Sequence, residues 1–303
     1  MSQSPVLDAN GQPISIALGY KRNKAKAVLT LKGIIEGIHC DEKINETELL
    51  FLRAWKDSDF FNFNDGDFID IHEQIEDILE DSLITMEEKS DILNMLDDII
   101  DYGGVAGSEA DALANQLLGF LNGISADNHL NDTEIHALLN ILKSSSSLSS
   151  RWPGNALKIR LDETLADGVI DDNEREDLLN LVKAVSGQKL FETGLAYGLS
   201  ADFSTCDSKQ LHLGDMSICF TGTFLSGNRD KQQLKAQELG AKVAPRVTKS
   251  LDVLVLGSLA SRDWKFSSYG RKIESVLSNR QSGSTTEIIN EETWNELVDL
   301  HHN

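Results

Sequence analysis

The sequence has few cysteines, no long apolar run and far fewer basic than acidic residues. Its three cysteines, Cys40, Cys206 and Cys219, lie far apart without a C-x-x-C pair, so they predict reduced thiols and exclude a disulfide frame or zinc site. No apolar run approaches the roughly 18 residues of a membrane span, and the start lacks the basic and apolar regions of a secretory signal. We therefore expect a globular cytoplasmic protein without a membrane partner.

The shortage of basic residues is confined to one part of the chain. The 303 residues contain 28 Lys or Arg and 49 Asp or Glu, which gives a formal charge of −21. From Cys206 onward twelve basic residues balance twelve acidic ones, so the preceding 16 and 37 carry the whole net charge. A protein that coats nucleic acid through a general cationic surface is excluded. Such a composition shift indicates a domain boundary.

The secondary-structure pattern changes at the same place. Apolar residues first recur at helical spacing, and later come short β-type runs such as SICFTG and VLVLG between helical segments. We predict a multidomain chain with an all-α domain followed by a small α/β domain. Its parts are a tail over 1–22, the helical domain over 23–188, a Gly- and Ser-rich linker over 189–210 and the α/β domain over 211–303.

The helical domain contains an internal repeat with an offset of 86 residues. A motif of Asp, then Ile or Leu, a capping residue and Glu occurs four times, as Asp41–Ile44–Asn45–Glu48, Asp81–Ile84–Thr85–Glu88, Asp127–Leu130–Asn131–Glu134 and Asp167–Ile170–Asp171–Glu174. The flanks follow the same offset, including Gly33 with Gly119 and Gly37 with Gly123, where we expect close helix packing. A duplicated four-helix unit is the economical explanation.

Each repeat motif predicts a hinge between two antiparallel helices. The capping residue and the Glu form a capping box, which satisfies the free N–H groups of a helix start. The leading Asp of each copy, however, lies where an acid is unfavourable to the helix dipole. Either it closes an Asx turn, or these carboxylates bind Ca²⁺ or Mg²⁺, or a basic protein partner. The candidate metal ligands are Asp41, Asp81, Asp127 and Asp167; no other cofactor is expected.

The hinge pattern D-G-x-I-x-x-x-E on paired helices resembles the TerB-like (tellurite-resistance) helical domain over residues 24–188. Asp167, Gly168, Ile170 and Glu174 match the pattern fully, whereas the other copies replace the glycine. The resemblance implies an all-α module whose acidic surface serves metal or partner binding in stress-related proteins. It does not imply an enzyme.

The second domain is predicted to have the element order βαββαβα with a parallel four-stranded sheet. Its ordered motifs are ICFTGTF, the helix beginning at Arg229, GAKV, VTKSLDVLVLG, SSYGRKIE and the segment from Ile288 to Trp294. Together they resemble a BRCT domain of the type fused to bacterial NAD-dependent DNA ligases and some replicative exonucleases.

The BRCT resemblance implies a phosphate site. In that family a Ser or Thr and the next Gly at the end of the first strand hold a phosphate with a Lys that starts the second helix. The matching positions are Thr221, Gly222 and Lys272, with Arg229 as the basic residue near the pocket and Arg271 as an additional cation. A hydroxyl, an open backbone N–H and an ammonium at a helix start form a small anion site.

The aromatic residues of this domain have simpler predicted roles. Trp294 is expected to anchor the core. Trp264 and Phe266 are expected to pack under their loop, with stacking on bases as the alternative.

The absent motifs indicate that the chain is not an enzyme. No K-x-D-G adenylation motif, P-loop, Rossmann fingerprint, H-E-x-x-H or G-x-S-x-G occurs. We expect an adaptor that binds a DNA 5′-phosphate end or nick in repair or replication. The alternatives are a phosphoprotein-binding or homodimerising BRCT scaffold and a module that responds to divalent metal.

Overall fold

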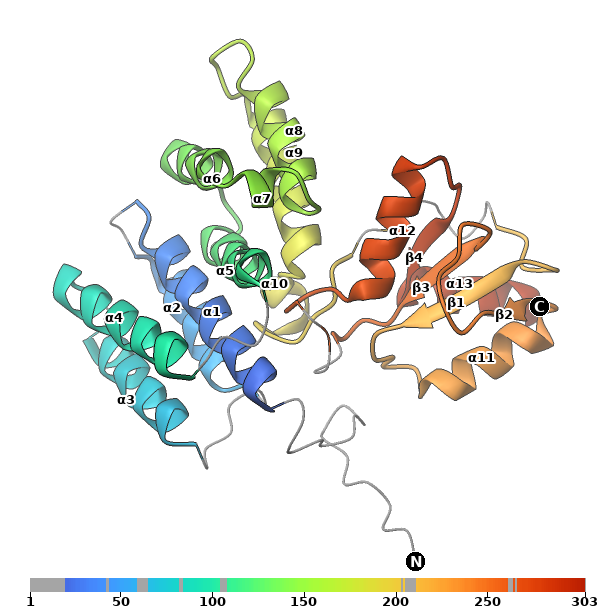
Figure 1. Ribbon diagram of the computed structural model, residues 1–303, viewed down its shortest axis with the longest axis horizontal. Coiled ribbons are helices and arrows are strands. Elements are labelled where there is room, and N and C mark those ends of the chain that lie inside the picture. Colours follow the sequence, from blue (N-terminus) through green and yellow to red (C-terminus); the bar gives the residue numbers. More distant parts are fainter. Residues whose placement is uncertain are drawn as a thin grey trace, which may run out of the picture. The chain divides into compact units, whose positions relative to one another are not determined.

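The computed structural model describes residues 20–41, 44–58, 65–81, 84–103, 108–202, 204, 211–260, 264 and 266–302. The chain divides into two compact units, Ser15–Leu199 and a second unit that contains Ser200–Asn303. The first is helical and the second is α/β (Figure 1), which confirms the predicted fold class. None of the described helices is both long and apolar enough to cross a membrane.

The helical unit shows the predicted duplication of four helices. The first copy consists of α1 (Tyr20–Ile38), α2 (Glu46–Lys56), α3 (Gly66–Asp81) and α4 (Met86–Gly103). The second consists of α5 (Glu109–Ile124), α6 (Asp132–Ser144), α8 (Gly154–Thr164) and α9 (Asp172–Ser186), with the one-turn α7 (Ser146–Ser149) inserted between α6 and α8. Adding 86 to the helix starts of the first copy therefore gives those of the second to within three residues.

The two copies meet where α1 packs along α5, and glycines allow the close approach. A Cβ atom on Gly33 would lie 2.0 Å from the carbonyl oxygen of Gln116, and one on Gly119 would lie 2.0 Å from that of Thr30. The second pair of equivalent glycines repeats this reciprocal contact one turn later. The backbones touch at positions related by the repeat, as the glycine spacing predicted.

Capping boxes form at all four hinges, as predicted. In each, the side chain of the capping residue accepts from the backbone N–H of the Glu, and the Glu carboxylate accepts from the N–H of the capping residue. The capped helices are α2, α4, α6 and α9. Each hinge thereby starts its second helix at a fixed residue.

The segment after α9 differs from the predicted linker of 189–210. It forms the short helix α10 (Leu190–Thr193), and Leu190, Ala196 and Tyr197 pack on the core of the first copy. Tyr197 meets Trp55 edge to face at a centroid distance of 5.4 Å. The helical unit therefore extends to Leu199. The apolar residues of the segment after α9 do not recur at helical spacing, so the sequence pattern did not predict their packing.

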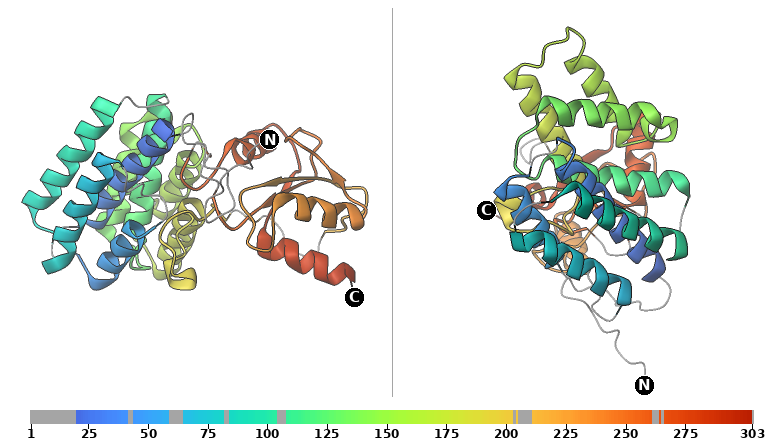
Figure 2. Two further views of the ribbon diagram at one scale, coloured as in Figure 1. Left: turned by 90° about the horizontal axis from the view of Figure 1, so that it is seen from below. Right: turned by 90° about the vertical axis from the view of Figure 1, so that its left-hand side faces the viewer.

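The second unit is built on a parallel sheet with the strand order β2-β1-β3-β4. Its strands are β1 (Ser217–Thr221), β2 (Lys242–Val243), β3 (Val253–Leu256) and β4 (Glu287–Asn290). The helices are α11 (Arg229–Glu238), α12 (Arg271–Gln281) and α13 (Glu291–His302), which gives the predicted order βαββαβα. Figure 2 shows this sheet between its helices. Because β1 and β3 are central, their residues are almost all buried.

The aromatic residues of this unit pack as predicted. Trp294 is fully buried, meets Phe220 at a centroid distance of 5.2 Å and donates its indole N–H to Gln232 Oε1 at 2.9 Å. Trp264 and Phe266 are also buried, so base stacking is not their role in this structure.

Candidate functional site

The candidate phosphate residues lie at the carboxyl edge of the parallel sheet. β1 ends at Thr221, α11 begins at Arg229 and α12 begins at Arg271. In a parallel sheet each crossover helix starts near the carboxyl end of the preceding strand, so strand ends and helix starts gather at one edge. Sequence segments up to 50 residues apart thus supply one site.

Thr221 and Gly222 present donors at this edge. Gly222 has a φ of +86°, a left-handed conformation that glycine adopts without strain. It directly follows Thr221, the last residue of β1. Within the described residues, neither the Thr221 hydroxyl nor the Gly222 N–H has a hydrogen-bond partner. Both groups therefore have hydrogen-bonding capacity left for a ligand, although Thr221 is only 3% exposed and Gly222 is buried.

Lys272 and Arg229 both bind backbone carbonyls next to Thr221. The Lys272 ammonium donates to the carbonyl of Phe220 at 2.9 Å, and an Arg229 Nη2 donates to the carbonyl of Gly222 at 3.2 Å. The two carbonyls flank Thr221 along the chain. Each cation has further N–H donors free for an anion. The structure thus brings Thr221, Gly222, Arg229 and Lys272 together.

Arg271 is placed less closely. It is the first residue of α12 and is exposed, and its guanidinium forms no hydrogen bond or ion pair with the described part of the chain. It adds positive charge at the same edge without a defined contact to Thr221.

Acids and bases lie at both edges of the sheet. Asp215, Asp252 and Glu287 lie at the amino edge together with Lys242. The carboxyl edge has the cations named above and also Asp230, Glu274 and Glu291 in the first turns of α11, α12 and α13. The helix N-termini at this edge favour anions. Its suitability for an anion therefore comes from these helix N-termini and from the placement of Lys272 and Arg229, not from an excess of basic residues.

Glu291 is a further residue of this edge that we did not single out from the sequence. Only 3% exposed, it accepts hydrogen bonds from the N–H groups of Leu225, Ser226 and Ser258 and from both serine hydroxyls, at 2.7 to 3.1 Å. Although burial opposes ionisation, these donors lower the pKa of the carboxyl. In the sequence Glu291 is merely the first of two glutamates after a strand, and nothing distinguishes it from Glu292.

The leading Asp residues of the repeat are explained by local and cross-copy hydrogen bonds. Asp127 and Asp167 accept from the N–H two residues later, at 2.9 and 3.0 Å, which is the predicted Asx turn. In addition, Asn45 Nδ2 donates to Asp127 at 3.0 Å, and Asn131 Nδ2 donates to Asp41 at 2.9 Å. Asp41, which follows α1, and Asp127, which follows α5, thus each contact the capping residue of the other copy.

These contacts gather carboxyl groups between the two copies. Glu48 and Glu134 are each 4% exposed, and burial together with the charges of Asp127 and Asp41 raises the pKa of both glutamates to about 8. Burial also raises the pKa of the neighbouring Cys40 thiol to about 12. That thiol is not a reactive nucleophile.

The metal prediction gains no support from the arrangement of these residues. In the part of the chain that the structure describes, no group of three or more His, Cys, Asp or Glu side chains is arranged to hold a metal ion. The side chain of Asp81, like residue Cys206, lies outside the described residues. Metal binding by Asp41, Asp81, Asp127 and Asp167 stays a prediction.

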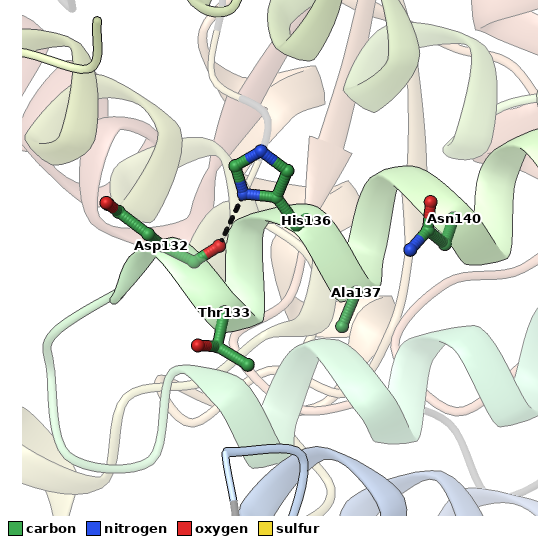
Figure 3. Close-up of a pocket in the computed structure, with 5 residues that line it drawn as sticks. All are labelled: Asp132, Thr133, His136, Ala137 and Asn140. Atoms are coloured by element: carbon green, nitrogen blue, oxygen red, sulfur yellow. Dashed lines mark hydrogen bonds between the residues drawn. The ribbon is translucent and has the colours of Figure 1, made fainter.

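A shallow depression on the helical unit is the remaining concave feature to consider. It is lined by residues of one face of α6, and Figure 3 shows the His136 ring turned back to the carbonyl of Asp132, with Nδ1 at 2.7 Å. Among the described residues no second element lines it. A single exposed helix face offers no convergent groups for a ligand.

Comparisons with known proteins match the second unit most clearly. Residues 209–280 match the family model of the BRCA1 C Terminus (BRCT) domain. The DNA ligases of two strains of Orientia tsutsugamushi, Boryong and Ikeda, are each 36% identical over 88 residues, which are 29% of this chain and 11% of each ligase. A DNA ligase of Bartonella bacilliformis is 28% identical over 144 residues, 48% of this chain and 16% of the ligase.

The chain thus spans about a tenth to a sixth of the length of these ligases. The resemblance of residues 24–188 to a TerB-like domain stays a prediction. Residues 209–280 form a BRCT domain, and it resembles the BRCT region of DNA ligases.

Proposed function

We propose that the BRCT unit binds a terminal phosphate and that its ligand is the 5′-phosphate of a DNA end or nick. The observation that carries this proposal is the placement of Lys272 and Arg229 on the two carbonyls that flank Thr221. A phosphate at this point would meet the Thr221 hydroxyl, the Gly222 N–H and two cations. Charge-assisted bonds of this kind are stronger than neutral ones.

The charge distribution favours the end of a duplex over its length. Coating of DNA requires many neutralised phosphates, whereas this unit is neutral by formal charge and places Lys272 and Arg229 beside a single residue, Thr221. The helical part of the chain, which carries the net charge of −21, repels the phosphodiester backbone. Contact confined to one phosphate and its neighbours avoids that repulsion.

In this proposal the chain is a binding module and not a ligase. The similarity to DNA ligases covers 88 to 144 residues of this chain and 11 to 16% of each ligase. The sequence has no K-x-D-G motif to carry an adenylate. The BRCT unit then delivers the helical unit to DNA ends, in repair or replication.

The test is an anisotropy measurement with labelled duplexes that carry either a 5′-phosphate or a 5′-hydroxyl. The wild type should bind the phosphorylated duplex at least tenfold more tightly, and Lys272→Ala and Thr221→Val should remove that preference. Lys249→Ala is the matched control, because Lys249 is exposed and lies before β3, at the amino edge. Equal wild-type affinity for both duplexes would exclude the DNA-end function.

A phosphopeptide provides the decisive competitor. If a phosphothreonine peptide displaces the phosphorylated duplex and binds more tightly, the ligand is a phosphoprotein and the DNA version is wrong. If the wild type prefers the phosphorylated duplex and the peptide does not compete, the DNA version stands.

A further inference from the structure

Glu291 forms no hydrogen bond with Thr221 or Gly222, yet it binds the loops that follow β1 and β3. We propose that Glu291 is a positioning residue: its buried carboxylate holds the loops after β1 and β3 so that Thr221, Gly222 and Arg229 face one phosphate. This inference rests on the proposed function. It assigns a role in ligand recognition to a residue of α13, an element that supplies none of the phosphate contacts.

The two carboxylate oxygens divide their bonds between the two loops. Oε1 accepts from the N–H and the hydroxyl of Ser226, each at 2.7 Å, in the loop between β1 and α11. Oε2 accepts from the N–H of Leu225 at 3.1 Å in that loop, and from the N–H and hydroxyl of Ser258 at 2.9 and 2.8 Å after β3. One side chain therefore ties together the exits of the two central strands.

The chemistry of this junction requires an ionised carboxylate. Three of the five contacts come from backbone N–H groups, which can only donate, and the side chain is 3% exposed. An amide would replace one acceptor oxygen by a donor and leave at least one buried N–H unpaired. All five contacts go to groups of the two loops, so the carboxylate can position the site through these loops.

The same network extends to the helix that carries Arg229. The Ser226 hydroxyl accepts from Gln232 Nε2 at 3.1 Å, and Gln232 Oε1 accepts from the indole of Trp294 at 2.9 Å. Gln232 is fully buried on α11, three residues after Arg229. Through Ser226 and Gln232, Glu291 therefore fixes the first turn of α11 as well as the β1 loop.

The loop after β3 supports the glycine turn directly. Thr223 and Leu259 exchange backbone hydrogen bonds at 2.8 and 3.1 Å, and a Cβ on Gly222 would lie 3.1 Å from Gly257. Because Glu291 binds Ser258, between Gly257 and Leu259, loss of its charge releases the loop that holds Gly222 in its left-handed turn. The Gly222 N–H would then lose its fixed direction.

The experiment compares the full chain with Glu291→Gln and Glu292→Gln, using 5′-phosphorylated and 5′-hydroxyl duplexes. Glu292 is the exposed neighbour on the same helix, and its substitution should change nothing. Glu291→Gln should reduce the preference for the phosphorylated duplex at least tenfold, with little change in affinity for the hydroxyl duplex. A merely structural role would lower both affinities together. Retention of the full preference by Glu291→Gln would overturn the proposal.

A second variant and a second readout keep the inference testable in any event. Should Glu291→Gln fail to fold, Ser226→Ala removes one bond to the carboxylate and the link to Gln232, and should reduce the preference three- to tenfold. If the wild type itself shows no preference for the phosphorylated duplex, the proposed function is wrong. The positioning role is then tested separately by amide hydrogen exchange. Faster exchange at Leu225, Ser226 and Ser258 in Glu291→Gln supports it; unchanged exchange there overturns it.

Discussion

The helical unit and the BRCT unit both bury glutamates that accept backbone hydrogen bonds, but the two environments act on these acids in opposite directions. Glu48 and Glu134 are 4% exposed, and Glu291 is 3% exposed. The pKa of each helical-unit glutamate is raised to about 8, whereas the pKa of Glu291 is lowered. The exposed fraction is nearly the same in all three, so low solvent exposure alone does not decide the ionisation state.

The difference follows from what surrounds each carboxyl. Glu48 accepts from the N–H of Asn45 at 2.8 Å and faces Asp127 and Asp41, which are like charges. Glu291 accepts from five donors on two loops. Several donors stabilise a buried carboxylate, while neighbouring acids favour its neutral form. The two units should therefore respond to pH with opposite signs.

The largest effect should come from adding a side chain at the close contact between α1 and α5. This substitution forces apart the two helices whose C-terminal hinges bring Asp41, Asp127, Glu48 and Glu134 together. In Gly119→Ala the new Cβ would lie 2.0 Å from the backbone oxygen of Thr30, so the helices must separate. We expect the helical unit to lose about 3 kcal/mol or more of its free energy of unfolding. Calorimetry should show its transition shifted down and the BRCT transition unchanged.

Gly66→Ala is the control for that substitution. Gly66 is the first residue of α3, and a Cβ there meets no atom within 4 Å. Its transition should stay at or above that of the wild type. Equal stability of Gly119→Ala and Gly66→Ala would contradict the close helix contact.

The next largest effect is the loss of stability of the helical unit with rising pH. Because the folded-state pKa of Glu48 and Glu134 exceeds the unfolded value, their contribution is fully present below about pH 4.5 and is lost as the pH rises through about 8. The double variant Glu48→Gln, Glu134→Gln keeps an acceptor for each capping N–H without a titrating group. This double variant should remove most of the decline in the free energy of unfolding with rising pH, which is on the order of a few kcal/mol.

Thermal melts of the full chain between pH 5 and 8.5 provide the measurement. Glu88→Gln serves as the control, because this partly exposed capping glutamate has a lowered pKa. A double variant whose melting temperature still falls as steeply as that of the wild type would show that other groups cause the decline.

The stability of the BRCT unit is expected to depend on pH in the opposite direction. The lowered pKa of Glu291 means that its contribution is present above the unfolded value and is lost as the pH falls through the folded one. Glu291→Gln should lower the free energy of unfolding of this unit by about 2 kcal/mol at neutral pH and weaken its acid sensitivity. Urea titrations at pH 7 and pH 4 check this, and a loss that is as large at pH 4 as at pH 7 speaks against it.

The smallest effect should come from removing one neighbouring charge. Asp127→Asn keeps an oxygen for the Asn45 amide but removes a negative charge that acts on both Glu48 and Glu134. We expect the pKa of each glutamate to fall by less than about one unit. Carboxyl carbon shifts in an NMR titration report this directly, and unchanged values would exclude Asp127 as a cause of the raised pKa.

Much of the fold could be predicted because its signals are local or repeat along the chain. Capping boxes require a fixed spacing within one turn, and the 86-residue offset exposes the duplication without any knowledge of the packing. The segment around Leu190 and Tyr197 could not be placed in this way. Its contacts are made with Trp55 and other distant residues, and it has no periodicity of its own.

The candidate site was predictable to the extent that family motifs mark it. Thr221, Gly222, Arg229 and Lys272 were identified from the resemblance, and the structure brings them together. Glu291 was not singled out, because its significance depends on five donors from two loops that the chain brings together only on folding. The cross-copy bonds of Asp41 and Asp127 were missed for the same reason.

The glycine contact between α1 and α5 also gives the helical unit an internal symmetry. Each glycine approaches the backbone of the helix that carries its own repeat equivalent, which is the isologous pattern of a twofold-symmetric interface. The two copies of the repeat thus meet as two identical subunits would, although they belong to one polypeptide.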